Sequence, residues 1–158
     1  MFSNKGSSQP QWNNNQTTDS MDIFCDKSPE DTITTIRFSN VTNWDNDPQF
    51  ISCSSWDNTV KVWEIQSSYN SCNAAYQGEF NFDAPVLGHC WAPDNSVIFG
   101  AGADNCVKVW DLKSNSCTKV GEHSNCVKDV YFNEANNILM SAGWDGRLRF
   151  WDMKQQGP

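Results

Sequence analysis

The sequence contains few histidines and few basic residues. Only 2 of its 158 residues are His, and 11 Lys and Arg stand against 19 Asp and Glu, which gives a formal net charge of -8. The only histidines are His89, which lies inside an apolar stretch at 86–91, and His123. With so few histidines a Ser-His-Asp catalytic arrangement is not expected, and we expect that the protein is not an enzyme. The negative charge disfavours binding to a phosphate backbone, and any contact with RNA is expected to be indirect.

Long apolar runs are also lacking. No stretch approaches the roughly 18 apolar residues of a membrane helix, and the first residues lack the apolar core of a secretory signal. The seven cysteines are odd in number and scattered, which favours reduced thiols in an intracellular protein over a disulfide framework. The chain is therefore not expected to have a membrane partner.

Motifs for metal and cofactor binding are weak. Cys117, His123 and Cys126 have the spacing C-x5-H-x2-C, which matches no standard zinc pattern. The small residues at 100–102 are not followed by the Lys-Ser or Lys-Thr of a phosphate loop. No cofactor and no metal are expected.

What the sequence does contain is a repeat. A turn Asp is followed six residues later by a Trp at three places, and in each copy the residues between them alternate between apolar and basic. The pairs are Asp57 and Trp63, Asp104 and Trp110, and Asp145 and Trp151. Successive Trp residues are 47 and 41 residues apart, close to the period of about 40 to 45 residues of a four-stranded propeller blade.

Period-two alternation and turn residues divide the chain into short strands. They are expected at 32–38, 50–54, 59–64 and 74–80, then at 86–91, 97–100, 107–111 and 117–120, and finally at 127–132, 138–141 and 147–152. A lone strand is expected at 22–25 and a polar insert at 43–47. The sequence ends before a fourth strand of the third group. Residues 1–20 contain 15 Ser, Thr, Asn, Gln, Gly or Pro and are expected to form a disordered polar tail, either a plain solvated leader or a segment that associates with other low-complexity chains.

These Asp, Trp and turn patterns resemble the WD40 family. The resemblance implies an all-β fold in which residues 21–158 form WD40 repeats, with blade 1 at about 31–80, blade 2 at about 83–120 and an incomplete blade 3 at about 123–153. Propellers close with about four to eight blades, so three blades do not make a complete ring. The resemblance implies that they form part of a seven-bladed propeller. By itself such a segment is expected to be marginally stable or to self-associate.

In WD40 blades the turn Asp, the third-strand Trp, a His at the blade entry and a Ser form a buried hydrogen-bonded set. Blade 3 has all four as His123, Ser141, Asp145 and Trp151. Blade 2 has Asp104 and Trp110 but Phe82-Asp83 at the entry, and blade 1 has only Asp57 and Trp63. We expect these residues to be structural.

Trp56 and Trp144 have a functional interpretation. Each directly precedes a turn Asp, whereas the third-strand Trp already serves the core, and the second repeat has Ala103 at this position. An exposed Trp is typical of protein interfaces, although the two rings could instead pack over neighbouring blades. We expect Trp56 and Trp144 to bind a partner.

Within the WD40 family the sequence resembles the nuclear-pore-associated mRNA export factors. The resemblance rests on Asp83-Ala84-Pro85-Val86-Leu87 and on the Ser-Trp-Asp and Gly-Trp-Asp turns. It implies a non-enzymatic scaffold of the nucleus, nuclear pore and cytoplasm that binds a nucleoporin segment, with Trp56 and Trp144 on the binding face. A spindle-checkpoint propeller, a generic WD40 adaptor such as a ubiquitin-ligase subunit, and a truncated product with little function of its own remain alternatives.

Overall fold

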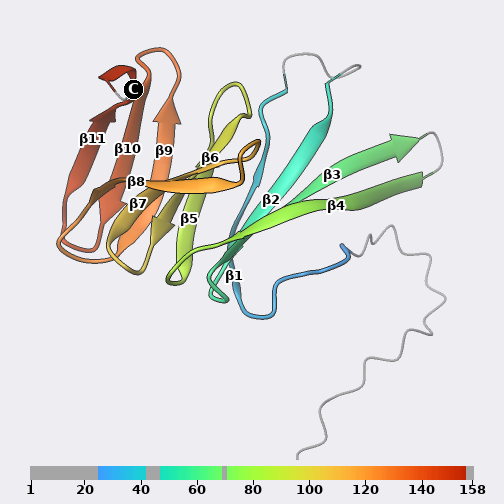
Figure 1. Ribbon diagram of the computed structural model, residues 1–158, viewed down its shortest axis with the longest axis horizontal. Helices are drawn as coiled ribbons and strands as arrows, with labels where there is room; N and C mark the ends of the chain where they lie inside the picture. Colours follow the sequence, from blue (N-terminus) through green and yellow to red (C-terminus); the bar gives the residue numbers. More distant parts are fainter. Residues whose placement is uncertain (1–24, 42–46, 69–70, 156–158) are drawn as a thin grey trace, which may run out of the picture.

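In the computed structural model the chain forms three antiparallel sheets arranged as a fan (Figure 1). The structure describes residues 25–41, 47–68 and 71–155. The expected polar tail at 1–20, most of the lone strand at 22–25 and most of the insert at 43–47 lie outside these residues, and Cys25 itself is not in a strand. No helix in the described part is long and apolar enough to cross a membrane.

Each sheet is built from consecutive strands, as in a propeller blade. The first has β1 (Ile33–Phe38), β2 (Gln49–Ser55), β3 (Thr59–Ser68) and β4 (Ser71–Asn81), and the second has β5 (Val86–Trp91), β6 (Val97–Gly102), β7 (Cys106–Asp111) and β8 (Ser116–Glu122). The third has β9 (Val127–Asn133), β10 (Ile138–Gly143) and β11 (Leu148–Asp152), followed by the short 3-10 helix η1 (Met153–Gln155). The predicted all-β architecture, with two four-stranded sheets and a three-stranded third sheet, is confirmed for the described residues. β3 and β4 are longer than expected and extend away from the body of the fan (Figure 1).

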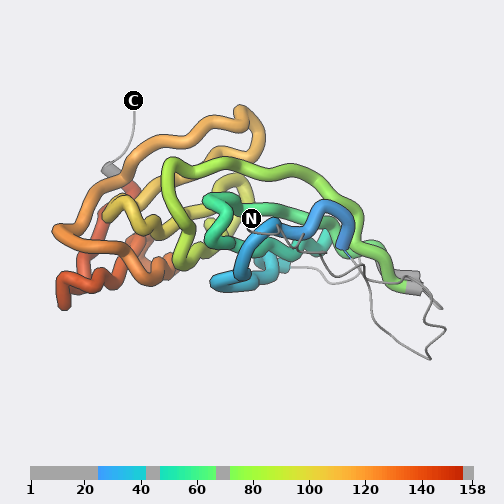
Figure 2. The backbone as a smooth tube through the Cα atoms, turned by 90° about the horizontal axis from the view of Figure 1, so that it is seen from below, coloured from blue at the N-terminus to red at the C-terminus, as the bar shows by residue number. Residues whose placement is uncertain are grey.

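The three sheets follow one another in space in the same order as in the sequence, and the tube view shows that they form a curved stack (Figure 2). The middle sheet is therefore covered on both faces, and all six residues of β5 are buried. On β5, His89 and Trp91 contact the first sheet, whereas Gly88 and Cys90 contact the third. A strand buried on both faces needs apolar or hydrogen-bonded side chains throughout.

Two apolar clusters join the sheets. The first lies between sheets one and two and consists of Val60, Val62, Phe82, Val86, Trp91, Ile98 and Trp110. The second lies between sheets two and three and consists of Cys90, Ala92, Phe99, Ala101, Val107, Val127, Val130 and Leu139. Each sheet face that looks into the fan is thus buried, because the alternation of a strand places every second side chain in the neighbouring cluster.

The outward faces of the first and third sheets keep large apolar side chains exposed. We call Ile33, Ile36 and Phe38 of β1 the first end face; Phe38 is 64% exposed. We call Tyr131, Leu148 and Phe150 the second end face; Leu148 is 69% exposed. In the register of the repeats, Leu148 and Phe150 correspond to Val60 and Val62, which are buried between sheets one and two.

Candidate functional site

The turn between the second and third strands has the same local structure in all three sheets. The turn Asp accepts a hydrogen bond from the backbone N–H two residues later, at 2.9 Å from Thr59 to Asp57, 3.1 Å from Cys106 to Asp104 and 3.1 Å from Arg147 to Asp145. The residue between donor and acceptor has a positive φ and is Asn58, Asn105 or Gly146, the residue types that tolerate the left-handed region. The repeat in sequence is therefore a repeat in conformation.

The residue before each turn Asp is also held in the same way. The backbone N–H of Trp56 donates to the carbonyl of Thr32 at 3.0 Å, that of Ala103 to Pro85 at 2.9 Å, and that of Trp144 to Cys126 at 2.8 Å. Each of these bonds ties the turn to the entry of the first strand of its sheet. The β2–β3, β6–β7 and β10–β11 turns consequently lie on one side of the molecule, the lower side in Figure 1.

The two indoles expected to bind a partner project from this side into solvent. Trp56 is 47% exposed and Trp144 is 58% exposed. The third-strand indoles of sheets one and two differ sharply, since Trp63 and Trp110 are each 3% exposed, and Trp151 of sheet three is partly buried. The structure thus separates the two kinds of Trp, one at a turn and one in the core.

The third-strand indoles occupy equivalent places on β3, β7 and β11 but use different acceptors. Trp63 Nε1 donates to the backbone carbonyl of Asp26 at 2.8 Å, and Trp110 Nε1 donates to Asn115 Oδ1 at 3.0 Å. Trp151 Nε1 donates to Ser141 Oγ at 2.9 Å. A buried indole N–H requires an acceptor, which comes from the segment before β1 for Trp63, from the β7–β8 turn for Trp110 and from β10 for Trp151.

In the third sheet the structure brings together the four side chains expected to act as a set. Ser141 Oγ lies 2.8 Å from His123 Nε2, and His123 Nδ1 lies 3.0 Å from Asp145 Oδ1. One direction of donation satisfies them all, from Trp151 to Ser141, from Ser141 to His123 and from His123 to Asp145. The hydrogen bond from His123 holds the pKa of Asp145 well below its usual range.

The other two sheets replace this set. In sheet two, Phe82 takes the entry position of His123 and packs against Gly100, which stands where sheet three has Ser141. In sheet one, the backbone N–H of Glu30 donates to Asp57 at 2.9 Å. Burial raises the pKa of Asp57, but hydrogen bonds from Thr59 and Glu30 outweigh this effect and leave the pKa below its ordinary value.

The comparisons with known proteins agree with this geometry. The WD domain, G-beta repeat family matches residues 24–64, 70–111 and 115–152. The chain belongs to the WD40 repeat family.

Among curated relatives, the WD40 chain is similar to proteins named mRNA export factor. It is 40% identical to mRNA export factor rae-1 of Caenorhabditis elegans over 121 residues, which is 77% of this chain and 31% of the relative. It is 35% identical to the mRNA export factors of Bos taurus and Sus scrofa over 116 residues, 73% of this chain and 30% of each relative. The chain spans about three tenths of the length of these relatives, and the resemblance to an mRNA export factor is confirmed.

A buried polar cluster between WD40 sheets one and two was not expected from the sequence. His89 is fully buried, with Nε2 2.7 Å from Ser52 Oγ and Nδ1 2.8 Å from Thr35 Oγ1. Trp91 Nε1 also donates to Ser52 Oγ at 2.8 Å. Burial lowers the pKa of His89 to about 3, assisted by the charge of Arg37. His89, Ser52 and Trp91 thus repeat the His-Ser-Trp arrangement of sheet three, but across two sheets.

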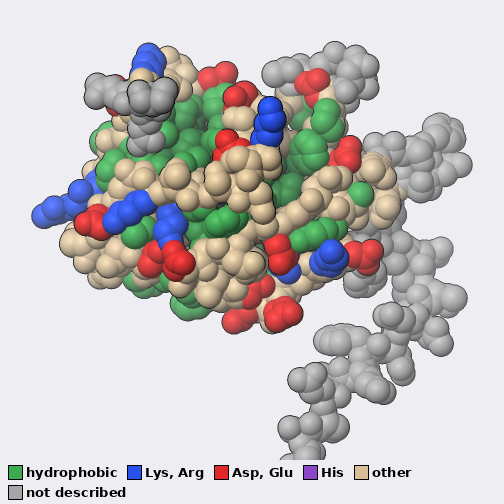
Figure 3. Space-filling view, in the orientation of Figure 1, with side chains coloured by type: hydrophobic (Ala, Val, Ile, Leu, Met, Phe, Trp, Pro, Cys, Tyr) green, Lys and Arg blue, Asp and Glu red, His purple; other side chains and the backbone are tan. Residues whose placement is uncertain are grey.

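We call the surface around Trp56, Ala103 and Trp144 the turn face, and exposed acidic side chains lie on it at the entries of sheets one and two, whereas the exposed Arg147 lies in the turn of Trp144. Glu30 and Asp31 precede β1 and are exposed, and Asp83 precedes β5 with its side chain 89% exposed. Lys108 is nearly buried and lies 2.6 Å from Asp83 and 2.7 Å from Asp104, so its charge is neutralised locally. In the space-filling view, acidic side chains gather along the lower edge below the β2–β3 turn (Figure 3).

The described residues contain no group of three or more His, Cys, Asp or Glu placed to hold a metal ion. Cys117, His123 and Cys126 do not converge, because His123 is bound to Ser141 and Asp145 while Cys126 Sγ donates to the carbonyl of Ala103 at 3.3 Å. The turn face offers two exposed apolar rings, with acidic side chains at the entries of sheets one and two, which suits binding better than chemistry.

Proposed function

We propose that the chain is a non-enzymatic protein-interaction scaffold of mRNA export that binds a nucleoporin segment on its turn face. The observation that carries the proposal is the exposure of Trp56 and Trp144 at equivalent turns, 47% and 58%, while the third-strand indoles of sheets one and two are buried. Relatives named mRNA export factor support the process. The nuclear pore, with the nucleus and cytoplasm on either side of it, is then the place of action.

The two indoles act as anchors because exposed Trp supplies a large apolar area with few rotatable bonds. The equivalent residue in the middle turn is Ala103. Its side chain is much smaller than an indole, so the bound segment contacts a large ring at each end and a small side chain between them. The acidic side chains of Glu30, Asp31 and Asp83 favour a segment with basic residues near its apolar ones. The same charges disfavour direct contact with an RNA backbone.

The experiment is a pull-down of the nucleoporin segment by the full 158-residue chain. Wild type is compared with Trp56→Ala, Trp144→Ala and the matched control Tyr131→Ala, which removes an aromatic ring that is 64% exposed on another surface. Capture should fall by about tenfold or more with either Trp variant, as expected for an interface hot spot, and should be unchanged with Tyr131→Ala. Equal capture by all four proteins would refute the proposal.

A further inference from the structure

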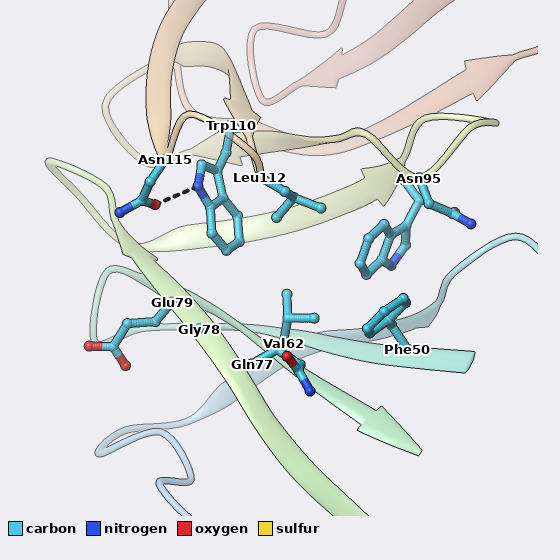
Figure 4. A pocket seen from close by; sticks show the side chains of 10 residues that line it. Phe50, Val62, Gln77, Gly78, Glu79, Asn95, Trp110, Leu112 and Asn115 are labelled. Atoms are coloured by element: carbon cyan, nitrogen blue, oxygen red, sulfur yellow. Dashed lines mark hydrogen bonds between the residues drawn. The ribbon is translucent and has the colours of Figure 1, made fainter. Parts of the chain in front are cut away.

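A groove opens between sheets one and two, away from the turn face. It has a volume of about 470 Å³, within the range of about 300 to 1,000 Å³ of sites that hold small ligands. Trp110 and Leu112 of the second sheet lie across the cavity from Val62 and Phe50 of the first (Figure 4). Trp91 also lines the groove and stacks on Phe50 with ring centroids 6.2 Å apart. We call this cavity the β4 groove, because residues 77–79 of β4 form its outer wall.

The sequence of β4 keeps the groove open. Gly78 pairs with Val62, and a Cβ added to Gly78 would have no atom within 4 Å. Its φ is not positive, so the backbone does not require glycine there. The missing side chain leaves space over the apolar floor of the groove.

Between sheets two and three the space beside the outer strand is filled, and the cavity found there is lined by Phe99, Phe132 and Met153 but by no residue of β8. There the outer strand β8 has its bulge between the partners of Val107 and Lys108, and Val120 at the bulge packs against the apolar cluster. On β4 the bulge lies between the partners of Val62 and Trp63, and the bulge residue is the exposed Gln77. The bulge thus lies at different places in β4 and β8, and the apolar Val120 of β8 is replaced in β4 by the polar Gln77 at the edge of the groove.

The lining of the groove contains one charged side chain, and that side chain is ion-paired. Of the ten described residues that line it, Glu79 is charged and none is Lys, Arg or His. Lys61 lies 3.1 Å from Glu79 but is itself nearly buried, whereas the Glu79 side chain is 35% exposed. A second carboxylate, Glu64, accepts a hydrogen bond from the rim residue Gln77 at 2.9 Å. Asp111, the last residue of β7, and Lys113 in the turn after it carry opposite charges.

We infer that the β4 groove is a second docking site, which accepts a large apolar side chain, preferably aromatic, from a partner polypeptide that carries Arg or Lys beside it. The apolar ring replaces water over the partly buried Phe50 and Leu112, which pack against the core cluster that contains Val62, Trp91 and Trp110. The neighbouring cation meets Glu64 and the exposed part of Glu79, which is already paired with Lys61, and the chain's net charge of -8 assists the encounter. This site is separate from Trp56 and Trp144, so a partner can occupy it together with a segment on the turn face.

The test is a residue-resolved NMR titration of the full chain with three short capped peptides, Arg-Phe-Arg, Glu-Phe-Glu and Arg-Ala-Arg. The Arg-Phe-Arg peptide should shift the indole N–H signals of Trp91 and Trp110 in a saturable way. At low salt it should bind about fivefold or more tightly than Glu-Phe-Glu, because the rim is acidic. It should bind about tenfold or more tightly than Arg-Ala-Arg, because the ring fills the apolar floor.

Two leucine substitutions on β4 separate the groove from the rest of the surface. Gly78→Leu places a side chain in the open space and should weaken Arg-Phe-Arg binding by about tenfold or more, whereas Asn73→Leu, on the exposed part of the same strand, should change it by less than about twofold. Gly78→Ala serves as a smaller filler should Gly78→Leu fold poorly. Trp56→Ala should leave this binding unchanged, which distinguishes the groove from the turn face. Absence of saturable binding, equal binding of the three peptides, or undiminished binding to the Gly78 variants would each overturn the inference.

Discussion

Gly121 on β8 lies against the indole ring of Trp151 on β11, so closely that a Cβ on Gly121 would overlap the ring. The outer strand of sheet two thereby covers the third-strand Trp of sheet three. At the corresponding place between sheets one and two, Phe80 contacts Trp110 with ring centroids 5.8 Å apart. The equivalent contact is thus made by a glycine between sheets two and three and by an aromatic ring between sheets one and two. The side-chain packing therefore differs between the two interfaces.

This fit predicts a large difference between two glycines in equivalent outer strands. Gly121→Ala should destabilise the chain by about 1 to 3 kcal/mol through overpacking against Trp151. Gly78→Ala, where a Cβ meets no atom within 4 Å, should change the free energy of unfolding by less than about 0.5 kcal/mol. Urea unfolding of both variants measures the difference, and equal effects would show that sheet three does not pack on β8 as described.

The hydrogen-bonded set of sheet three predicts the effect of removing its central member. Ser141→Ala leaves Trp151 Nε1 and His123 Nε2 without their partner and should lower the free energy of unfolding by about 1 to 3 kcal/mol, the usual effect of an unsatisfied buried polar group. Ser114→Ala, in an exposed turn, is the matched control and should be neutral. If Ser141→Ala were as stable as the control, the set would contribute nothing to the fold.

Much of the fold was predictable because residues close together in the sequence determine the repeat. The turn Asp, the left-handed Asn or Gly after it, and the alternating residues that lead to Trp63, Trp110 or Trp151 all act within a few residues. The unexpected features depend on neighbours distant in sequence. His89 lies among Thr35, Ser52 and Ser54 of another sheet. The only hint of this polar cluster in the sequence is the presence of Ser and Thr within short apolar strands.

The candidate site, too, could be predicted from the sequence only in part. The positions of Trp56 and Trp144 before the turn Asp are sequence features, and their exposure follows from the shared turn. The β4 groove, by contrast, depends on the register of β3 and β4, where one bulge decides whether a side chain fills the space beside Trp110. Bulge positions are not encoded by hydrophobic periodicity, so the groove becomes apparent only from the paired strands.

The buried His89 predicts a specific dependence of stability on pH. Its folded pKa of about 3 lies below the ordinary value of 6.5, so between these values the unfolded chain binds the proton more readily than the folded one. Stability should therefore rise with pH across this window, and fall by up to about 1.4 kcal/mol per pH unit on acidification. Unfolding of wild type and His89→Gln from pH 6.5 to 4.5 isolates this contribution, because the carboxylates are common to both. Parallel pH profiles would contradict the assignment.

The two end faces predict self-association of the chain in solution. The first presents Ile36 and Phe38, 57% and 64% exposed, and the second presents Leu148 and Phe150, 69% and 64% exposed. Since they are different surfaces, head-to-tail contact between copies is expected. Sedimentation velocity should show a mass that rises with concentration, and Phe150→Lys should raise the midpoint concentration by about tenfold or more. Asn73→Lys, on exposed β4, is the control. A monomer at all concentrations, or association unaffected by Phe150→Lys, would exclude this mode.

The central claim is that the chain uses two kinds of Trp, one for its core and one for a partner, and the direct test compares Trp56→Ala with Trp63→Ala. Trp56 is 47% exposed and Trp63 is 3% exposed, only seven residues later in the same hairpin. For each variant the free energy of unfolding and the affinity for the nucleoporin segment are measured. We predict that Trp63→Ala lowers the unfolding free energy by about 3 to 5 kcal/mol, whereas Trp56→Ala changes it by less than about 0.5 kcal/mol and weakens binding by about tenfold or more. A Trp56→Ala protein that binds the segment as tightly as wild type, or that is destabilised as strongly as Trp63→Ala, would contradict the claim.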